Sequence, residues 1–456
     1  MINVADTPPP DRSIQDPRVK ARIQQLRQTD DFTNLGYLAG VWLFLAAVIG
    51  ATTWFFVAQA ANGWSWWWNV PVTLAAIVLV GAGQHQLTGL AHDASHHILF
   101  KTRRWNDLAS DLFCMFPIFS TTHHYRLQHI AHHQFTNDPE RDPDVSQLQT
   151  SGHWLDFPLE KAAFVKTLLK QLWPPNLVRY MRIRARYNAL GTDKNPYLKK
   201  GKNSPKLAIL AGIGYLLSLA GVLTASVWSG NSWALGVAPF AMLAPILVFY
   251  ALLPDRFYSA SRVKPVITPR QMTLMRMTFL TLLLSSVAWL THTTGKPVWM
   301  WFFLLWVVPI FTSFSFFMVL RQLVQHGNGD RGWLTNTRVF FVNPLIRWAV
   351  FPMGQDYHLP HHMYASIPHY RLPDLHELLL GTHEYRNEAT VVEGYFLPPV
   401  QPPRNPTVLD VVGPEYATGS KEVHLDHSVL DGIEVENKEE LLAMHGTSPR
   451  ATKAAG

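Results

Sequence analysis

The stretch QHIAHHQ, residues 128–134, places three histidines within five residues. On a helix, side chains three and four positions apart share a face, so His129, His132 and His133 can point toward one place. Neutral imidazole binds iron, zinc, copper and nickel, and several imidazoles at this spacing can form a metal site without cysteine. The stretch therefore predicts a helix that carries metal ligands.

Two further clusters, HDASHH (92–97) and HLPHH (358–362), and the single His326 extend the pattern. An isolated histidine near a membrane is usually a polar anchor, which is how we interpret His153 and His292. Three clusters in one chain are hard to explain by coincidence. The candidate ligands are His92, His96, His129, His132, His133, His326, His358, His361 and His362.

The number of candidates bears on the metal. Nine imidazoles are too many for one tetrahedral zinc, whereas two six-coordinate ions with open positions would use them, and this favours iron. The only cysteine is Cys114, so the chain can form no intramolecular disulfide and no cysteine-ligated cluster.

The composition predicts a membrane protein. Apolar residues make up 48% of the chain and charged residues 16%, with 17 tryptophans and 25 phenylalanines. A helix of about 20 apolar residues crosses the ~30 Å hydrocarbon core, and tryptophans favour its interfaces. We expect an all-α, multi-span transmembrane bundle of about four to six spans, chosen from 36–58, 70–91, 206–228, 232–254, 272–291 and 298–320. The run 108–119 is too short to cross and is expected to be re-entrant or interfacial.

Basic residues orient the bundle. The loops 60–69 and 229–231 carry no Lys or Arg, whereas 92–205 carries many, including a row at Arg179, Arg182, Arg184 and Arg186. The excess of positive charge places 92–205 on the cytoplasmic side, together with everything after residue 320. The row could bind an acidic protein or anionic lipid, or be only this orientation signal. We expect a polar lead (1–35), disordered or lying on the surface, a membrane domain (36–385) whose cytoplasmic helical cap (92–205 and 321–385) carries the histidines, and a flexible C-terminal tail (386–456).

The three clusters resemble the histidine boxes of the integral-membrane fatty acid desaturase and hydroxylase superfamily. The likeness extends to YRLQHIAHHQFTNDPERDPD (125–144) and DYHLPHHMYASIPHYRLPDLHE (356–377), and it covers about 36–376. The resemblance implies a non-haem di-iron centre that uses O2 and two electrons to attack an unactivated C–H bond. It also implies that the nine histidines above are the ligands, His326 being an isolated ligand after the last span. The family core has four long spans, so the pair 206–254 is expected to be extra or only partly inserted.

Other polar residues near the boxes have less certain roles. His97 could replace His96 as a ligand, although we favour His96. Asn328 could hold a bridging water, and His85 could support a ligand, although an interfacial histidine is the more common case. Asp93 and Asp138, with their acidic neighbours in NDPERDPD, are expected to cap helices or accept hydrogen bonds from ligand imidazoles rather than bind metal.

The predicted reaction is desaturation of an acyl chain. Hydroxylation or ketolation of a fatty acyl chain or a carotenoid is the alternative on the same scaffold, and a metal transporter is a remote one, since the clusters lie outside the spans. The chain has no HPGG motif of a fused cytochrome b5 domain, so electrons are expected from a separate ferredoxin or cytochrome b5 with its reductase. No nucleic-acid partner is expected. The membrane would be the inner membrane in a bacterium or the endoplasmic reticulum in a eukaryote.

Overall fold

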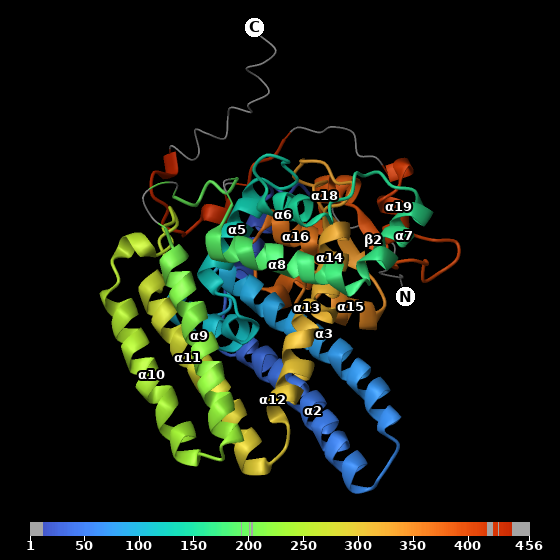
Figure 1. Cartoon of the computed structure of the whole chain (residues 1–456). Helices are drawn as coiled ribbons and strands as arrows, with labels where there is room; N and C mark the ends of the chain where they lie inside the picture. Colours follow the sequence, from blue (N-terminus) through green and yellow to red (C-terminus); the bar gives the residue numbers. More distant parts are fainter. Residues whose placement is uncertain are drawn as a thin grey trace.

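The computed structural model describes residues 12–192, 194–199, 201, 204–416, 423–426 and 428–439. Among them nearly every regular element is a helix. Two three-residue strands, β1 (Val339–Phe341) and β2 (Val391–Glu393), pair in parallel. The predicted all-α class is confirmed. Figure 1 shows long helices that project from one side of a cap of shorter ones.

Six helical segments are long and apolar enough to cross a bilayer, and they coincide with the six predicted spans. At 1.5 Å per residue, lengths of 21 to 30 residues match the ~30 Å hydrocarbon core. The chain is therefore a multi-pass membrane protein. The segments are Thr33–Ala61 (α2), Trp66–Ser95 (η1, Trp66–Trp68, continued by α3, Asn69–Ser95), Lys206–Trp228 (α9), Ser232–Leu252 (α10), Pro269–Thr294 (α11) and Val298–Gln325 (α12 to α14).

The sixth span is not one regular helix. It consists of α12 (Val298–Phe302), a π-helical turn (Phe303–Val307), α13 (Val308–Phe311) and α14 (Ser313–Gln325). Pro309 has no backbone N–H to give to a helix, and Thr312 leaves helical geometry at φ −126° and ψ −95°. The break lets α14 pack on α3 and carry the end of the span into the cap.

The cap brings together segments from three parts of the chain (Figure 1). Its longest helix, α8, packs on α6 and on α14, and the short α16 packs on α17 and β1. The cap helices are α4 (Arg103–Ser110), α5 (Thr122–Gln134), α6 (Pro143–Ser151), α7 (Lys161–Gln171), α8 (Pro174–Leu190), α15 (Pro344–Val350), α16 (His358–Met363), α17 (Leu372–Leu380), α18 (His383–Glu388) and α19 (Val408–Val411).

The pair α9 and α10 packs together with α11 as a three-helix unit. Tyr215 and Leu219 of α9, Leu243 and Tyr250 of α10 and Leu280 of α11 form its buried apolar core. Residues 206–254 were expected to be an extra or partly inserted pair. The two helices, of 23 and 21 residues, are the shortest of the six candidate spans but are long enough to cross a bilayer, and they have their own packing partner in α11.

The segment 108–119 folds back between the spans and the cap. After α4 it forms a π-helical turn (Asp111–Met115) and a short 3-10 turn (Phe116–Ile118). Two indoles hold it, because Trp42 Nε1 donates to the carbonyl of Phe113 at 3.0 Å and Trp306 Nε1 donates to that of Pro117 at 2.8 Å. The segment does not cross the bundle, and it buries Cys114.

Both ends of the described chain differ from the expected lead and tail. Residues 17–26 form α1 (Pro17–Leu26), which buries Val19, Ile23 and Leu26 in a core shared with α17. At the other end, β2 pairs with β1, and α19 packs on β2 and α7. These segments complete the cap over residues 12–35 and 386–416. Residues 1–11, 417–422, 427 and 440–456, also assigned to the lead and tail, lie outside the described residues.

Candidate metal centre

Four elements bring the nine candidate histidines together. His92 lies in the last turn of α3 and His96 is its C-cap residue. The helix α5 carries three of the candidates, α16 carries three more, and His326 follows the last residue of α14 as its C-cap. Each of these helices ends inside the cap, so the side chains converge although the residues span more than half of the chain.

The histidines form two neighbouring groups. Within each group, one ring nitrogen of every member lies within 4.8 Å of the corresponding nitrogen of every other member. The rings of His133 and His362, one from each group, stack with centroids 4.1 Å apart. The five-histidine group contains His92, His96, His129, His133 and His361, and the four-histidine group contains His132, His326, His358 and His362.

The spacing of the ring nitrogens fits shared cations. His133 Nε2 lies 3.0 Å from His129 Nε2 and 2.9 Å from His361 Nε2. A ring nitrogen has either one hydrogen or one lone pair in the ring plane, so it cannot make two good hydrogen bonds. Two nitrogens at about 2.1 Å from one ion and at right angles are about 3 Å apart. The geometry is therefore that of ligands around an ion.

The four-histidine group repeats this arrangement. His326 Nε2 lies 3.2 Å from His132 Nε2 and 2.9 Å from His358 Nε2. In addition, the Nε2 atoms of His92, His96 and His362 are buried and have no hydrogen-bond partner in the protein. Buried polar atoms without a partner are costly, and a metal ion in each group would satisfy them. The residues present thus fit two metal ions.

The outward-facing nitrogens are held by polar neighbours. His132 Nδ1 lies 3.0 Å from Asp142 Oδ2, and His326 Nδ1 donates to the carbonyl of Asn336 at 3.1 Å. An Nδ1–H held in this way leaves the Nε2 lone pair free for a metal and fixes the ring orientation. Asp142 also caps α6 by accepting from the backbone N–H of Asp144. One carboxylate therefore contacts both a candidate ligand and the N-terminus of a cap helix.

Electrostatics favour the neutral, metal-binding form of the rings of His129 and His133, and they set His132 apart. Burial, together with the neighbouring imidazoles, lowers the pKa of His129 and of His133 well below the usual value, so both rings are neutral. Burial also lowers the pKa of His132, but the carboxylate of Asp142 outweighs it and raises that pKa to about 9. Among the nine histidines, His132 thus interacts most strongly with a carboxylate.

Several polar residues considered from the sequence do not reach the two groups. His97 has φ 60° and lies beside Asp107 and Arg126, so it is His96 that joins the five-histidine group. Asn328 was a candidate for holding a bridging water, but its amide nitrogen donates to the carbonyls of Val411 and Gly413, in the C-terminal segment. His85 Nδ1 donates to the carbonyl of Ala349 at 2.8 Å.

The two acidic candidates face other partners. Asp93 accepts from His369 Nδ1 at 2.9 Å, while His92 Nδ1 is 3.8 Å away, beyond hydrogen-bond distance. Asp138 pairs with Arg141 and Arg331, each at 2.8 Å. Of the acidic run NDPERDPD, Asp142 is the member that touches a histidine of the two groups. Its position directly before Pro143 marks it as a helix N-cap, a signal that the sequence offers.

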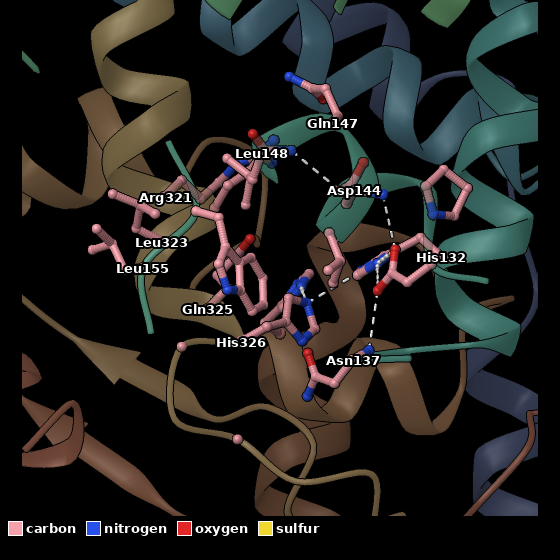
Figure 2. Close-up of a pocket in the computed structure, with 18 of the residues that line it drawn as sticks. His132, Asn137, Asp144, Gln147, Leu148, Leu155, Arg321, Leu323, Gln325 and His326 are labelled. Atoms are coloured by element: carbon pink, nitrogen blue, oxygen red, sulfur yellow. Dashed lines mark hydrogen bonds and ion pairs between the residues drawn. The ribbon is translucent and has the colours of Figure 1, made fainter. Parts of the chain in front are cut away.

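A cavity of about 490 Å³ lies beside both groups. Figure 2 shows Arg321 and Gln325 of α14 on one side of it and Asp144 and His132 on the other. Apolar side chains from the segment 154–158 complete its wall. Five of the nine histidines line this cavity: His92, His129, His132, His326 and His358.

Comparison with known proteins supplies the family. The sequence model of the family described as Fatty acid desaturase matches residues 65–273 and 250–389. The chain is 29% identical over 191 residues to dihydrorhizobitoxine desaturase of Bradyrhizobium elkanii, which is 41% of this chain and 50% of that protein. It is 35% identical over 94 residues to fatty acid desaturase 3 of Bos taurus, 20% of each chain, and 40% identical over 72 residues to Delta(8)-fatty-acid desaturase of Euglena gracilis, 16% of this chain and 17% of that protein.

The matched stretches thus span about half of the first relative and about a fifth of the others. The family match, by contrast, extends over most of the chain and contains all nine histidines. The chain belongs to the fatty acid desaturase family.

Proposed function

We propose that this protein is a membrane-bound oxidoreductase that uses two iron ions, O2 and two electrons to convert a C–C bond of an aliphatic chain into C=C. The reaction would be R–CH2–CH2–R′ + O2 + 2e⁻ + 2H⁺ → R–CH=CH–R′ + 2H2O. The observation that carries the proposal is the pair of buried histidine groups that touch through His133 and His362.

The ligand numbers favour iron over zinc. Five imidazoles on one ion and four on the other exceed what tetrahedral zinc takes, and they leave one and two positions open around six-coordinate ions. Bound iron would supply the activation of O2 and the removal of hydrogen from carbon. The same nine residues are our proposed ligands, His96 rather than His97 among them.

The protein's own residues hold and orient this centre. Asp142 and the carbonyl of Asn336 keep Nδ1–H on His132 and His326, so that their Nε2 atoms face the metal. The adjacent cavity gives a substrate access to five of the histidines, and the cap covers the remaining ligands and keeps bulk water from them.

The substrate and partners follow from the surroundings of the site. A lipid or acyl substrate suits a centre at the end of a membrane bundle, and two of the relatives are named for fatty acids. We propose that the cap faces the cytoplasm, because the basic loops are on that side and the loops between paired spans are at the other end of the bundle (Figure 1). Electrons would come from a separate ferredoxin or cytochrome b5 with its reductase.

The experiment is metal and product analysis of the purified protein and of two variants. The wild type should hold about two irons per chain, and its lipid products should lose two hydrogens. His133→Ala should lose iron and product, whereas His292→Ala, at the far end of α11, should retain both. A fully active preparation with one zinc and no iron would contradict the di-iron proposal. A product that gains one oxygen would instead identify a hydroxylase.

A further inference from the structure

Arg321 of α14 is a buried cation without a partner. It is 7% exposed, it lines the cavity beside the histidines, and it makes no hydrogen bond or ion pair with any described residue. Arg126 is also buried, but its guanidinium is fully partnered, since it donates to Asp107 and to the carbonyls of Ala94 and Ser95. A buried charge needs a counter-charge or hydrogen bonds. Arg321 has no hydrogen bond and no ion pair within the described protein, and the carboxylate of Asp144 attracts it only from beyond ion-pair distance.

A second, smaller cavity of about 150 Å³ brings two more arginines to the same place. It shares Arg321, Arg184, Tyr125 and Asn188 with the larger cavity, so the two adjoin along these side chains. Arg276 of α11 lines the smaller cavity, and its buried Nε has no partner. No acidic side chain lines this smaller cavity among the described residues. We call the three residues Arg184, Arg276 and Arg321 the arginine triad.

The acidic residues that line the larger cavity have other partners than the triad. Asp142 faces His132, and Asp144 accepts from Gln322 Nε2 at 3.2 Å. Asp156 accepts from Trp154 Nε1 at 3.1 Å, and Asp330 accepts from the hydroxyl of Thr335 at 2.5 Å. None of these carboxylates forms an ion pair with an arginine of the triad. The hydrogen bond of Arg184 goes to a neutral side chain, the amide oxygen of Gln147, at 3.0 Å. The side chains that line both cavities therefore include two arginines and no carboxylate.

We propose that the arginine triad binds a carboxylate of the substrate, so that the substrate is a free aliphatic acid. This rests on the proposed function for what happens to the aliphatic chain. Guanidinium groups present forked donors that match the two oxygens of a carboxylate, and a desolvated site strengthens the interaction. The carboxylate would lie at the junction of the cavities, with the chain in the larger one beside the histidines.

The position of the triad limits how far the reacting bond is from the acid group. Arg321 precedes His326 by five residues on α14, which is about 7.5 Å along the helix axis. The chain attached to the carboxylate therefore passes the histidine groups within its first several carbons. The larger cavity, about 490 Å³, has the size of a small-molecule site. The short separation between Arg321 and His326 and the small cavity volume both favour a compact acid as the substrate, with the oxidised bond near its carboxylate.

Binding of octanoate tests the proposal. The full-length, iron-loaded protein is placed in phosphatidylcholine nanodiscs, and radiolabelled octanoate is displaced by unlabelled octanoate or by methyl octanoate, its neutral ester. We expect the acid to compete at least tenfold better than the ester. Arg321→Met should weaken octanoate binding at least tenfold and leave competition by the ester unchanged, with Arg321→Lys between the two. Arg182→Met, an exposed arginine on the same helix as Arg184, is the matched control and should bind as the wild type does.

The outcomes separate this inference from the proposed function. Octanoate binding needs no turnover, so an inactive protein that still distinguishes acid from ester would support the triad and contradict only the reaction. Equal competition by acid and ester in the wild type would overturn the inference, even if Arg321→Met failed to fold. So would full octanoate binding by an iron-loaded Arg321→Met protein. Displacement of octanoate by phosphatidylglycerol added to the nanodiscs would assign the triad to a lipid phosphate instead and would also refute the substrate assignment.

Discussion

Replacing Asp142 with asparagine should weaken metal binding by the four-histidine group without unfolding the cap. Asparagine is as good an N-cap residue as aspartate, so the start of α6 is kept. What disappears is the negative charge 3.0 Å from His132 Nδ1, which raises the pKa of that ring to about 9. Mutation of the residue that supports a metal-bound histidine typically costs 10- to 100-fold in metal affinity, or about 1.4–2.8 kcal/mol.

The assay is chelator titration of the iron-loaded protein in nanodiscs, with bound iron counted per chain. Asp142→Asn should release about one of two irons at 10- to 100-fold lower chelator concentration than the wild type. Asp138→Asn is the matched control, because Asp138 lies in the same acidic run but pairs with Arg141 and Arg331. Equal iron retention by Asp142→Asn and the wild type, or an equal loss in Asp138→Asn, would refute the role given to Asp142.

Three further outcomes follow from the structure. Substitution of His326 by alanine should remove iron from the four-histidine group and abolish turnover while the protein stays inserted, and His292→Ala should do neither, as iron analysis will show. Gly81→Ala should lower the thermal unfolding midpoint, because a Cβ there would lie 2.7 Å from a backbone nitrogen of α14, and such overpacking destabilises by about 1–3 kcal/mol. The control Gly50→Ala meets nothing within 4 Å and should be neutral or slightly stabilising. Burial raises the pKa of Asp111 from 3.8 to about 6, so ionisation of this carboxyl destabilises the folded protein as the pH rises from about 4 to about 6. Asp111→Asn should therefore stabilise the protein more at pH 8 than at pH 5, by at most about 3 kcal/mol. Equal unfolding midpoints for wild type and variant at pH 8 would count against this.

Local spacing predicted that the histidines within a cluster share a face, whereas the resemblance to the family implied that the three clusters and His326 come together. The pattern in 128–134 requires a helix with three histidines near one face, and α5 has that form. The choice between His96 and His97 could not come from spacing, because it depends on where α3 ends. The helix stops at Ser95, and His97 turns away with a positive φ toward Asp107.

Residues whose role depends on distant partners were harder to predict. Asp138 and Asp142 lie in one acidic run, and although Pro143 marks Asp142 as an N-cap, the sequence does not tell which of the two contacts a histidine. Asp138 is instead paired with Arg331, which comes from another part of the chain. Arg321 follows the last predicted span, 298–320, and the sequence gives it no role, because its environment is made by α8 and α11. Nothing in its own neighbourhood of the sequence signals that it lacks a counter-charge.

The terminal segments show the limit of composition. The region around α1 is polar overall, which predicted a disordered or surface-lying lead. Its apolar residues Val19, Ile23 and Leu26 nevertheless recur at helical spacing and bury one face against α17. Such a short amphipathic helix gains its stability from tertiary contacts, so composition averaged over 35 residues conceals it.

The most direct test of the central claim is anomalous diffraction at the iron absorption edge from crystals of the iron-loaded protein. The account predicts two iron peaks per chain, one surrounded by the nitrogens of His92, His96, His129, His133 and His361, and the other by those of His132, His326, His358 and His362. A single peak, or a peak coordinated by His97 in place of His96, would contradict it.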